Sequence, residues 1–197
     1  MKDKPHINMK RIFIAVKIDP GDTLMNMIST FKTDLKDEKI KWTETENYHI
    51  TLAFLGDMEE EKIKAVDKML RRVCEGFNGF EMVIKGAGVF KSFKDMRVIW
   101  TSIKPSEKLN KLNNSIKIGL KDTGITIEDR AFSPHLTLGR IKSISYNDTL
   151  KSLVDKYHDA EIQKQTVIEV ILYESILLPA GPVYKPLGKY PLQQANL

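Results

Sequence analysis

The sequence predicts an α+β protein built from two pseudo-symmetric lobes, each a small and mainly antiparallel sheet with helices outside and a cleft between the sheets. Three observations predict this fold class. Strand-like and helix-like segments alternate along the chain, and their order repeats in both halves. The 197 residues are 42% hydrophobic, which is enough apolar material for a folded core.

The first half indicates two rounds of strand followed by helix. Arg11–Ile18 is rich in β-forming residues, and Asp22–Leu35 places apolar side chains at helical spacing. Tyr48–Leu55 is the next expected strand. Asp57 and Glu60 then form a capping-box pattern, which predicts that a helix starts there.

The second half repeats this order. Its expected elements are strands over Phe80–Ile84 and Arg97–Ile103 with a turn at Gly86–Gly88 between them, a helix over Leu109–Leu120, a strand at His135, and a helix over Leu150–Tyr157. The C-terminal section predicts strands over Thr166–Leu178 and Val183–Tyr190, joined by a turn at Pro179–Pro182.

The repeat has a fixed register, because His135 follows His49 by 86 residues and the same offset lays Arg11–Ile14 on Arg97–Trp100. Identity between the halves is otherwise low, which favours a pair of lobes over a long array of repeats. No Pro- or Ser-rich linker separates the halves. We therefore expect one compact bilobal domain over residues 1–197, with a first repeat at 11–75, a second at 97–160 and C-terminal strands at 166–190.

Charge and cysteine content bound the possible functions. Lys and Arg outnumber Asp and Glu by 31 to 26, which modestly favours an anionic ligand. Cys74 is the single cysteine, and its place on the apolar stripe of an expected helix predicts a buried thiol without a catalytic role. The first residues resemble no secretion signal, and Glu174 interrupts the best apolar stretch. We expect a cytoplasmic protein with no membrane association.

Each half contains one tetrad of the form HxTL, at His49–Leu52 and at His135–Leu138. Two such tetrads at equivalent places in a repeat exceed the chance matches expected of a short motif. Alternation along a strand puts His49 and Thr51 on one face and predicts that Phe54 lies on the opposite, apolar face. A twofold relation between the lobes would then set the two imidazoles on opposite sides of an active cleft.

Opposed histidines and threonines suit in-line cleavage of a phosphodiester. A neutral histidine can accept a proton from water while a protonated histidine donates one to the leaving oxygen, since an imidazole pKa near 6.5 makes both states accessible. The hydroxyls of Thr51 and Thr137 can donate to the non-bridging phosphate oxygens. The histidines lack the spacing of a metal site, so we expect no metal and no cofactor. Either histidine could also be an ordinary half-buried strand residue, an alternative that the second motif in register makes weaker.

The chain resembles a known family at several places. These segments are Arg11–Ala15 (RIFIA), Asn47–Gly56 (NYHITLAFLG), Gly88–Phe90 (GVF), Pro134–Arg140 (PHLTLGR) and Leu172–Ser175 (LYES). Together they resemble the RNA 2′,3′-cyclic phosphodiesterases of the two-histidine phosphoesterase superfamily, formerly described as 2′-5′ RNA ligases. The likeness extends over about residues 10 to 192.

The resemblance implies a role for several residues. His49 matches the proton donor and His135 the proton acceptor, while Thr51 and Thr137 match the phosphate-binding hydroxyls. Two further residues match substrate-binding positions, Arg140 and Phe13. Strand alternation alone would turn Arg140 away from His135 unless the chain bulges near Gly139.

The function implied is metal-independent hydrolysis of a terminal RNA 2′,3′-cyclic phosphate to a 2′-phosphate, by a phosphoric diester hydrolase that acts as a monomer. The partner is RNA or an oligonucleotide with such an end, and tRNA fragments are one source. Two alternatives remain at this point: an RNA or nucleotide binding module without turnover, and a reversible 2′-5′ RNA ligase, which would use the same chemistry in the opposite direction.

Overall fold

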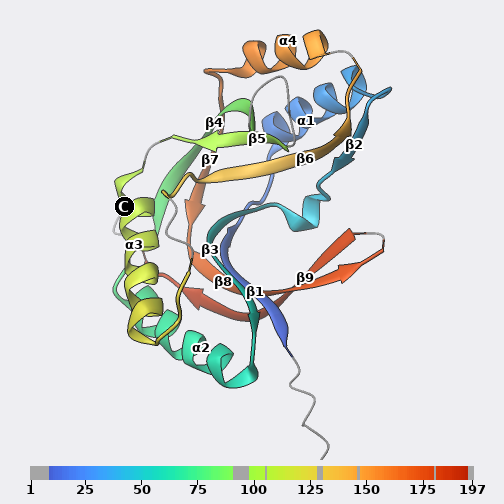
Figure 1. Cartoon of the computed structure of the whole chain (residues 1–197). Helices are drawn as coiled ribbons and strands as arrows, with labels where there is room; N and C mark the ends of the chain where they lie inside the picture. Colours follow the sequence, from blue (N-terminus) through green and yellow to red (C-terminus); the bar gives the residue numbers. More distant parts are fainter. Residues whose placement is uncertain are drawn as a thin grey trace, which may run out of the picture.

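The computed structural model describes residues 9–90, 98–104, 106–127, 131–145, 147–179 and 181–194 (Figure 1). In chain order its elements are β1 (Lys10–Lys17), α1 (Asp22–Asp34), β2 (Lys39–Trp42), the short 3-10 helix η1 (Thr45–Asn47), β3 (His49–Met58), α2 (Glu60–Glu75), β4 (Phe80–Phe90), β5 (Val98–Ile103), α3 (Glu107–Asp122), β6 (His135–Ser143), α4 (Asn147–Tyr157), β7 (Glu161–Val167), β8 (Glu169–Leu178) and β9 (Gly181–Pro191). Arg97 and Ala180 lie outside the described residues.

The strands form one curled sheet in the order β7-β4-β5-β6-β3-β1-β8-β9, with β2 beside β6. All pairings between these strands are antiparallel. We call β3, β1, β8 and β9 the β1 lobe, which α2 and α3 cover, and β7, β4, β5, β6 and β2 the β5 lobe, which α1 and α4 cover (Figure 1). The predicted fold class, α+β with antiparallel sheets in two lobes and helices outside, is confirmed.

The two halves of the sequence exchange elements between the lobes. The 86-residue offset relates β1 to β5, β3 to β6 and β4 to β8. Yet β4 pairs with β5, and β8 pairs with β1. The helices are exchanged as well, because α1 packs in the β5 lobe and α3 against β3. Neither half of the chain therefore completes a lobe with its own elements.

The helices bury the apolar faces that their spacing predicts. In α3 the side chains of Leu109, Leu112, Ile116 and Leu120 are fully buried, and the Ser106 hydroxyl accepts the hydrogen bond of an N-cap from the Leu109 amide at 3.2 Å. Cys74 on α2 is buried too, and this burial raises the pKa of its thiol to about 12. No helix in the described ranges is both long and apolar enough to cross a membrane.

Two expected boundaries are wrong. Asp57 does not cap α2, because it remains in the β3 ladder opposite Arg11, and the N-cap residue is Glu59, which makes no side-chain cap bond. The glycines at 86–88 do not form a turn either, because β4 continues through them to Phe90. Gly86 has a φ of 71° at a register shift in β4, so its conformational freedom makes a bulge within a strand.

The single strand expected over Thr166–Leu178 is also wrong. It is two strands, β7 and β8, which separate at Ile168, and they belong to different lobes. Ile168 is 65% exposed, so an apolar residue occupies the connection. Ile168 is β-branched, so the sequence over Thr166–Leu178 has the composition of one continuous strand. The end of β7 could therefore not be recognised from composition alone.

Candidate active site

The two HxTL motifs meet where the lobes join. Ile50 of β3 pairs with Leu136 of β6, and each is the second residue of its motif. Because the strands are antiparallel, this pairing sets His49 on the side of Thr137 and Thr51 on the side of His135. Ile50 and Leu136 are buried, while the histidines and threonines beside them are partly exposed on the opposite face. A local twofold relation therefore arranges the four polar side chains.

Both motif strands bulge immediately after the threonine. Ala15 pairs with Thr51 and Ile14 with Ala53, which leaves Leu52 as an extra residue in β3. In the same way, Trp100 pairs with Thr137 and Ile99 with Gly139, which leaves Leu138 as an extra residue in β6. The two bulges lie at the same place in the repeat. Each bulge shifts the alternation of side chains by one residue.

The carbonyl groups of both bulge residues are satisfied. The Leu52 carbonyl accepts a hydrogen bond from the side-chain amide of Asn113 on α3 at 2.7 Å, and that asparagine is fully buried. The Leu138 carbonyl accepts one from the backbone amide of Thr43 at 2.9 Å. A Cβ at Gly139 would lie 3.0 Å from the side chains of Ile40 and Trp42, so any larger residue there would make a tight contact. Elements outside the motifs thus fix both bulges.

The bulges decide which residues reach the cleft. Arg140 is exposed and lines the pocket, so the bulge beside Gly139 brings it to the face of His135. Phe54 also lines this pocket with 49% of its surface exposed, and its expected place on the buried apolar face is wrong. Ala53, which strict alternation would put beside His49 and Thr51, is buried instead. The physical reason is the same shift of alternation in both strands.

The two histidine rings are held alike. The Nδ1 of His49 lies 2.7 Å from the Asn47 carbonyl oxygen, and the Nδ1 of His135 lies 2.8 Å from the Ser133 carbonyl oxygen. A carbonyl oxygen only accepts, so each Nδ1 carries its proton and donates it. The atom left for proton exchange in each ring is therefore Nε2. Asn47 is itself fixed, because its side-chain amide donates to the Pro182 carbonyl at 3.0 Å.

One pocket of about 520 Å³ brings the expected site residues together. All six line it: His49, Thr51, His135, Thr137, Arg140 and Phe13. The other lining residues include Arg11, Lys41, Trp42, Glu44, Phe54, Lys142, Ser175, Leu177 and Tyr184. Among the residues that the structure describes, no three or more His, Cys, Asp or Glu side chains are grouped to hold a metal ion.

Aromatic rings surround each histidine differently. The His49 ring centroid lies 5.0 Å from that of Phe13 and 5.1 Å from that of Tyr184, which meets it edge to face. Burial lowers the pKa of His49 below its usual 6.5; the hydrogen bond to Asn47 opposes this, and the charge of His135 adds to it. The His135 ring meets Phe90 edge to face at 4.6 Å. Among the described residues, two aromatic rings contact His49 and one contacts His135.

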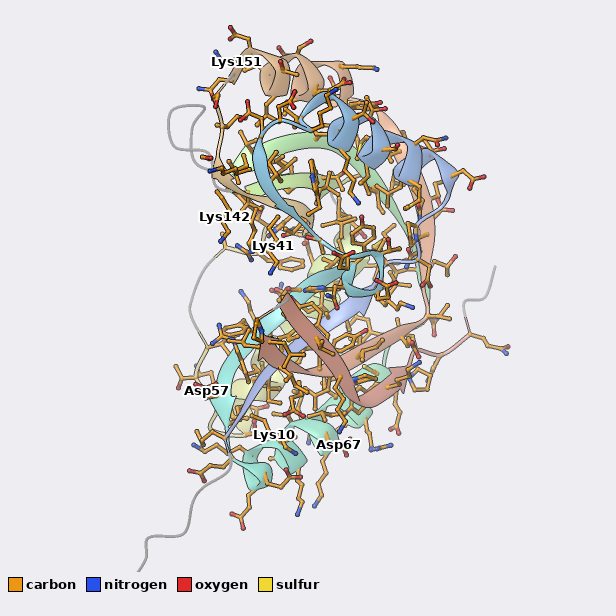
Figure 2. The ribbon with its side chains drawn as sticks, turned by 90° about the vertical axis from the view of Figure 1, so that its right-hand side faces the viewer. Lys10, Lys41, Asp57, Asp67, Lys142 and Lys151 are labelled. Carbon is orange, nitrogen blue, oxygen red and sulfur yellow. The ribbon has the colours of Figure 1, made fainter. Side chains whose placement is uncertain are left out.

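The pocket has a cationic side. Lys41 pairs with Arg140 across β2 and β6, and Lys142 follows two residues later; Figure 2 shows Lys41 and Lys142 on the same side of the molecule, at the level of the lobe boundary. Burial raises the pKa of the Tyr184 hydroxyl, and the charges of Arg140 and Arg11 oppose this rise. Within the described ranges, Glu44 is the acidic residue that lines the pocket. This side can attract an anionic ligand.

Sequence reasoning gave no site role to Lys41, Lys142, Tyr184 or Phe54. Lys41 and Lys142 stand in strands of ordinary mixed polarity, and Tyr184 is far from both motifs in the chain. Phe54 had a usable signal, because it follows His49 by five residues as Arg140 follows His135. The repeat itself relates these two positions.

Comparison with known proteins gives the family. The LigT-like phosphoesterase model matches the chain over residues 16–100 and again over 103–184. The RNA 2′,3′-cyclic phosphodiesterase of Methanothermobacter thermautotrophicus is 35% identical over 184 residues, 92% of this chain and 98% of that protein. The protein of the same name from Archaeoglobus fulgidus is 35% identical over 178 residues, 90% of this chain and 97% of its own length. A phosphoesterase crystal structure aligns with a TM-score of 0.75 at 26% identity, over 95% of this chain and 100% of that one. The chain belongs to the LigT-like phosphoesterase family.

Proposed function

We propose that this protein hydrolyses the 2′,3′-cyclic phosphate at the end of an RNA strand to a 2′-phosphate, without a metal ion. Relatives that are 35% identical over most of their length carry the name RNA 2′,3′-cyclic phosphodiesterase. The observation that carries the mechanism is the matched pair of histidines. Each is fixed through Nδ1 to a backbone carbonyl, and both line one pocket.

In the proposed reaction His49 is the proton donor and His135 the proton acceptor. Neutral Nε2 of His135 takes a proton from water as the water oxygen bonds to phosphorus, and protonated His49 gives its Nε2 proton to O3′ as the P–O3′ bond breaks. The lowered pKa of His49 makes the ring neutral more readily in the empty site. A phosphate anion bound beside it favours the protonated form, because opposite charges attract. Substrate binding therefore increases the protonated fraction of His49.

The remaining site residues act on the phosphate. The hydroxyls of Thr51 and Thr137 donate to the two non-bridging oxygens as negative charge grows there. The Arg140 guanidinium adds a positive charge on the same face. Phe13 is 4% exposed and lies against the His49 ring, so it shapes the wall that the substrate meets beside this histidine.

The finer features of the substrate and its setting are part of the same proposal. We expect RNA or oligonucleotides, tRNA fragments among them, to be the partners of a monomeric protein in the cytoplasm. The exchange of strands and helices between the lobes supports one bilobal body over residues 1–197, with repeats at about 11–75 and 97–160. Light scattering would measure the mass in solution, and limited proteolysis would reveal a separable half.

The decisive experiment uses an oligonucleotide that ends in a 2′,3′-cyclic phosphate, incubated with the protein in excess EDTA. Mass spectrometry should show the gain of one water, and the product should be the 2′-phosphate. Activity that EDTA removes and a divalent ion restores would reject the acid/base mechanism. Binding without turnover would favour a nucleotide-binding module, and joining of the cyclic end to a 5′-hydroxyl as the main reaction would favour a ligase.

A further inference from the structure

We propose that Asn47 is a positioning residue for His49, through which the hairpin of β8 and β9 holds the proton donor in its working orientation. This inference rests on the proposed hydrolysis of a cyclic phosphate with His49 as the acid, and it adds the element that controls this acid. Both histidines are held through Nδ1 by a backbone carbonyl. The segments that carry these two carbonyls are anchored differently.

Asn47 connects three elements through three of its polar groups. Its backbone amide donates to the Glu44 carbonyl at 2.9 Å and closes the η1 turn. Its backbone carbonyl accepts the Nδ1 proton of His49 on β3 at 2.7 Å, and its side-chain amide donates to the Pro182 carbonyl on β9 at 3.0 Å. A displacement of β9 at Pro182 therefore reaches the His49 ring through a single residue.

The position of Pro182 explains why its carbonyl is available to Asn47. β9 is the last strand in the order of the sheet, and an edge strand directs some of its backbone groups away from the neighbouring strand. Proline suits an edge strand because it has no N–H to pair. The hairpin therefore offers an acceptor at its edge, and the Asn47 side chain binds it.

A second group of β9 contacts the same histidine. Tyr184 follows Pro182 by two residues, so strand alternation puts both side chains on one face, and both residues line the pocket. The Tyr184 ring meets the His49 ring edge to face at 5.1 Å, and it meets the Phe13 ring at 4.9 Å. β9 thus acts on His49 at two places, the carbonyl that holds Nδ1 and the ring itself.

The segment that holds His135 is anchored less firmly. The Ser133 carbonyl accepts the His135 Nδ1 proton at 2.8 Å, but Ser133 is exposed and its hydroxyl forms no hydrogen bond with a residue in the described ranges. The ring that meets His135 is Phe90, which belongs to β4. Among the described residues, the hydrogen bonds and ring contacts of the hairpin thus reach His49 and not His135.

The orientation of the acid matters because proton transfer is directional. The Nε2 proton of His49 must point at O3′, on the side of phosphorus opposite to the attacking water. The carbonyl at Nδ1 fixes both the tautomer and the rotation of the ring. If the Asn47 side chain no longer holds this carbonyl in place, the ring can rotate and Nε2 faces O3′ for less of the time.

The test varies how much the leaving group needs an acid. Adenosine 2′,3′-cyclic phosphate loses an alkoxide, which needs a proton. Its analogue with sulfur in place of O3′ loses a thiolate, which can leave without a proton because a thiol has a pKa of about 8.5. In both reactions the water oxygen bonds to phosphorus and the water proton goes to His135. The sulfur ester yields a 2′-phosphate and a free 3′-thiol, with no proton required from His49.

The expected result is a loss confined to the oxygen ester. Asn47→Ala should lower its single-turnover rate at saturating protein concentration by about tenfold, because the proton donor is misdirected. The same variant should leave the rate for the sulfur ester within about twofold. Asn47→Ser, whose hydroxyl is too short to reach the Pro182 carbonyl, should behave in the same way.

Three further variants calibrate this comparison. His49→Ala should spare the sulfur ester and lose more on the oxygen ester than Asn47→Ala, because it removes the acid altogether. His135→Ala should slow both esters, because both need a base. Asn110→Ala, at an exposed position of α3, is the matched control and should change neither rate. Circular dichroism shows whether each variant is folded.

A measurement on the wild-type protein needs no variant to fold. The segment at Asn47 is anchored to β9, so it should open less often than the segment at Ser133. NMR should therefore show the Nδ1 proton of His49 exchanging with water more slowly than that of His135. Equal or reversed exchange rates would contradict anchoring by the hairpin.

The outcomes separate this inference from the proposed function. If the wild-type protein opens neither ester, the proposed function fails. If it opens both, but the Asn47 variants slow both by the same factor, change only the binding of the esters or change nothing, the positioning role of Asn47 is overturned while the hydrolase stands. A loss confined to the oxygen ester supports this role, because a general defect of folding or of substrate binding would affect the two esters equally.

Discussion

Ile50 on β3 pairs with Leu136 on β6, and in the described part of the chain this pair joins the two halves of the sheet. Each residue stands between the histidine and the threonine of its motif. The spacing of the four polar groups is therefore set by backbone pairing of two buried residues instead of by loops. A site held by strands in this way keeps its groups close to their working positions before substrate arrives.

The histidines give the first prediction. His49→Ala and His135→Ala should each lower turnover of a cyclic-phosphate oligonucleotide by at least about 10²-fold, because each removes one proton-transfer group. Single-turnover kinetics with circular dichroism would measure this. His158→Ala is the matched control, since His158 is exposed and its ring pairs with Asp159 outside the pocket. Near-normal turnover in a folded His49 or His135 variant would remove that residue from the mechanism.

The threonine hydroxyls give the second. Thr51→Val and Thr137→Val keep the shape of the side chain but remove the donor, so each should lower kcat by about 10²-fold, with a smaller effect on KM. Thr→Ser at the same positions should recover most of the rate. Thr166→Val on β7 provides the same exchange at an exposed strand position. If valine were tolerated at both motif positions, the hydroxyls would have no role in stabilising the transition state.

The third prediction concerns pH. Burial lowers the pKa of His49 in the folded protein, so the unfolded chain binds this proton first as the pH falls below about 6.5. Proton uptake then favours unfolding, and His49 makes the protein less stable at about pH 5 than at about pH 7.5. His49→Gln should lose less stability over this interval. Urea unfolding at both pH values measures the difference, and equal losses in the two proteins would contradict it.

Asn113 provides a test of how the site is supported from α3. Its side-chain amide donates to the Leu52 carbonyl inside the core, so Asn113→Ala should lower the free energy of unfolding by about 2 kcal/mol. Asn114→Ala on the exposed side of the same helix should have little effect. Chemical denaturation of both variants measures whether the Asn113 hydrogen bond stabilises the fold or can be lost without cost. Equal stability of the two variants would show that this hydrogen bond does not stabilise the fold.

The sequence by itself determined much of this protein. The apolar stripe of α3 predicted the burial of Leu109, Leu112, Ile116 and Leu120, and two HxTL motifs at one offset predicted a two-lobed sheet with a shared cleft. Such features are local. A helix face and a strand face follow from periods of 3.6 and 2 residues, which can be counted along the chain.

The tertiary structure alone decided which side of the motif strands Phe54 and Arg140 occupy. Their directions depend on the extra residues Leu52 and Leu138, and an extra residue exists only relative to the partner strand that leaves it unpaired. The groups that satisfy the freed carbonyls come from elsewhere, namely Asn113 on α3 and the Thr43 amide. The same holds for the exchange of β4 and β8 between lobes. Pairings between distant segments produce no periodic pattern in the sequence. The contacts that stabilise them form only after folding has brought those segments together.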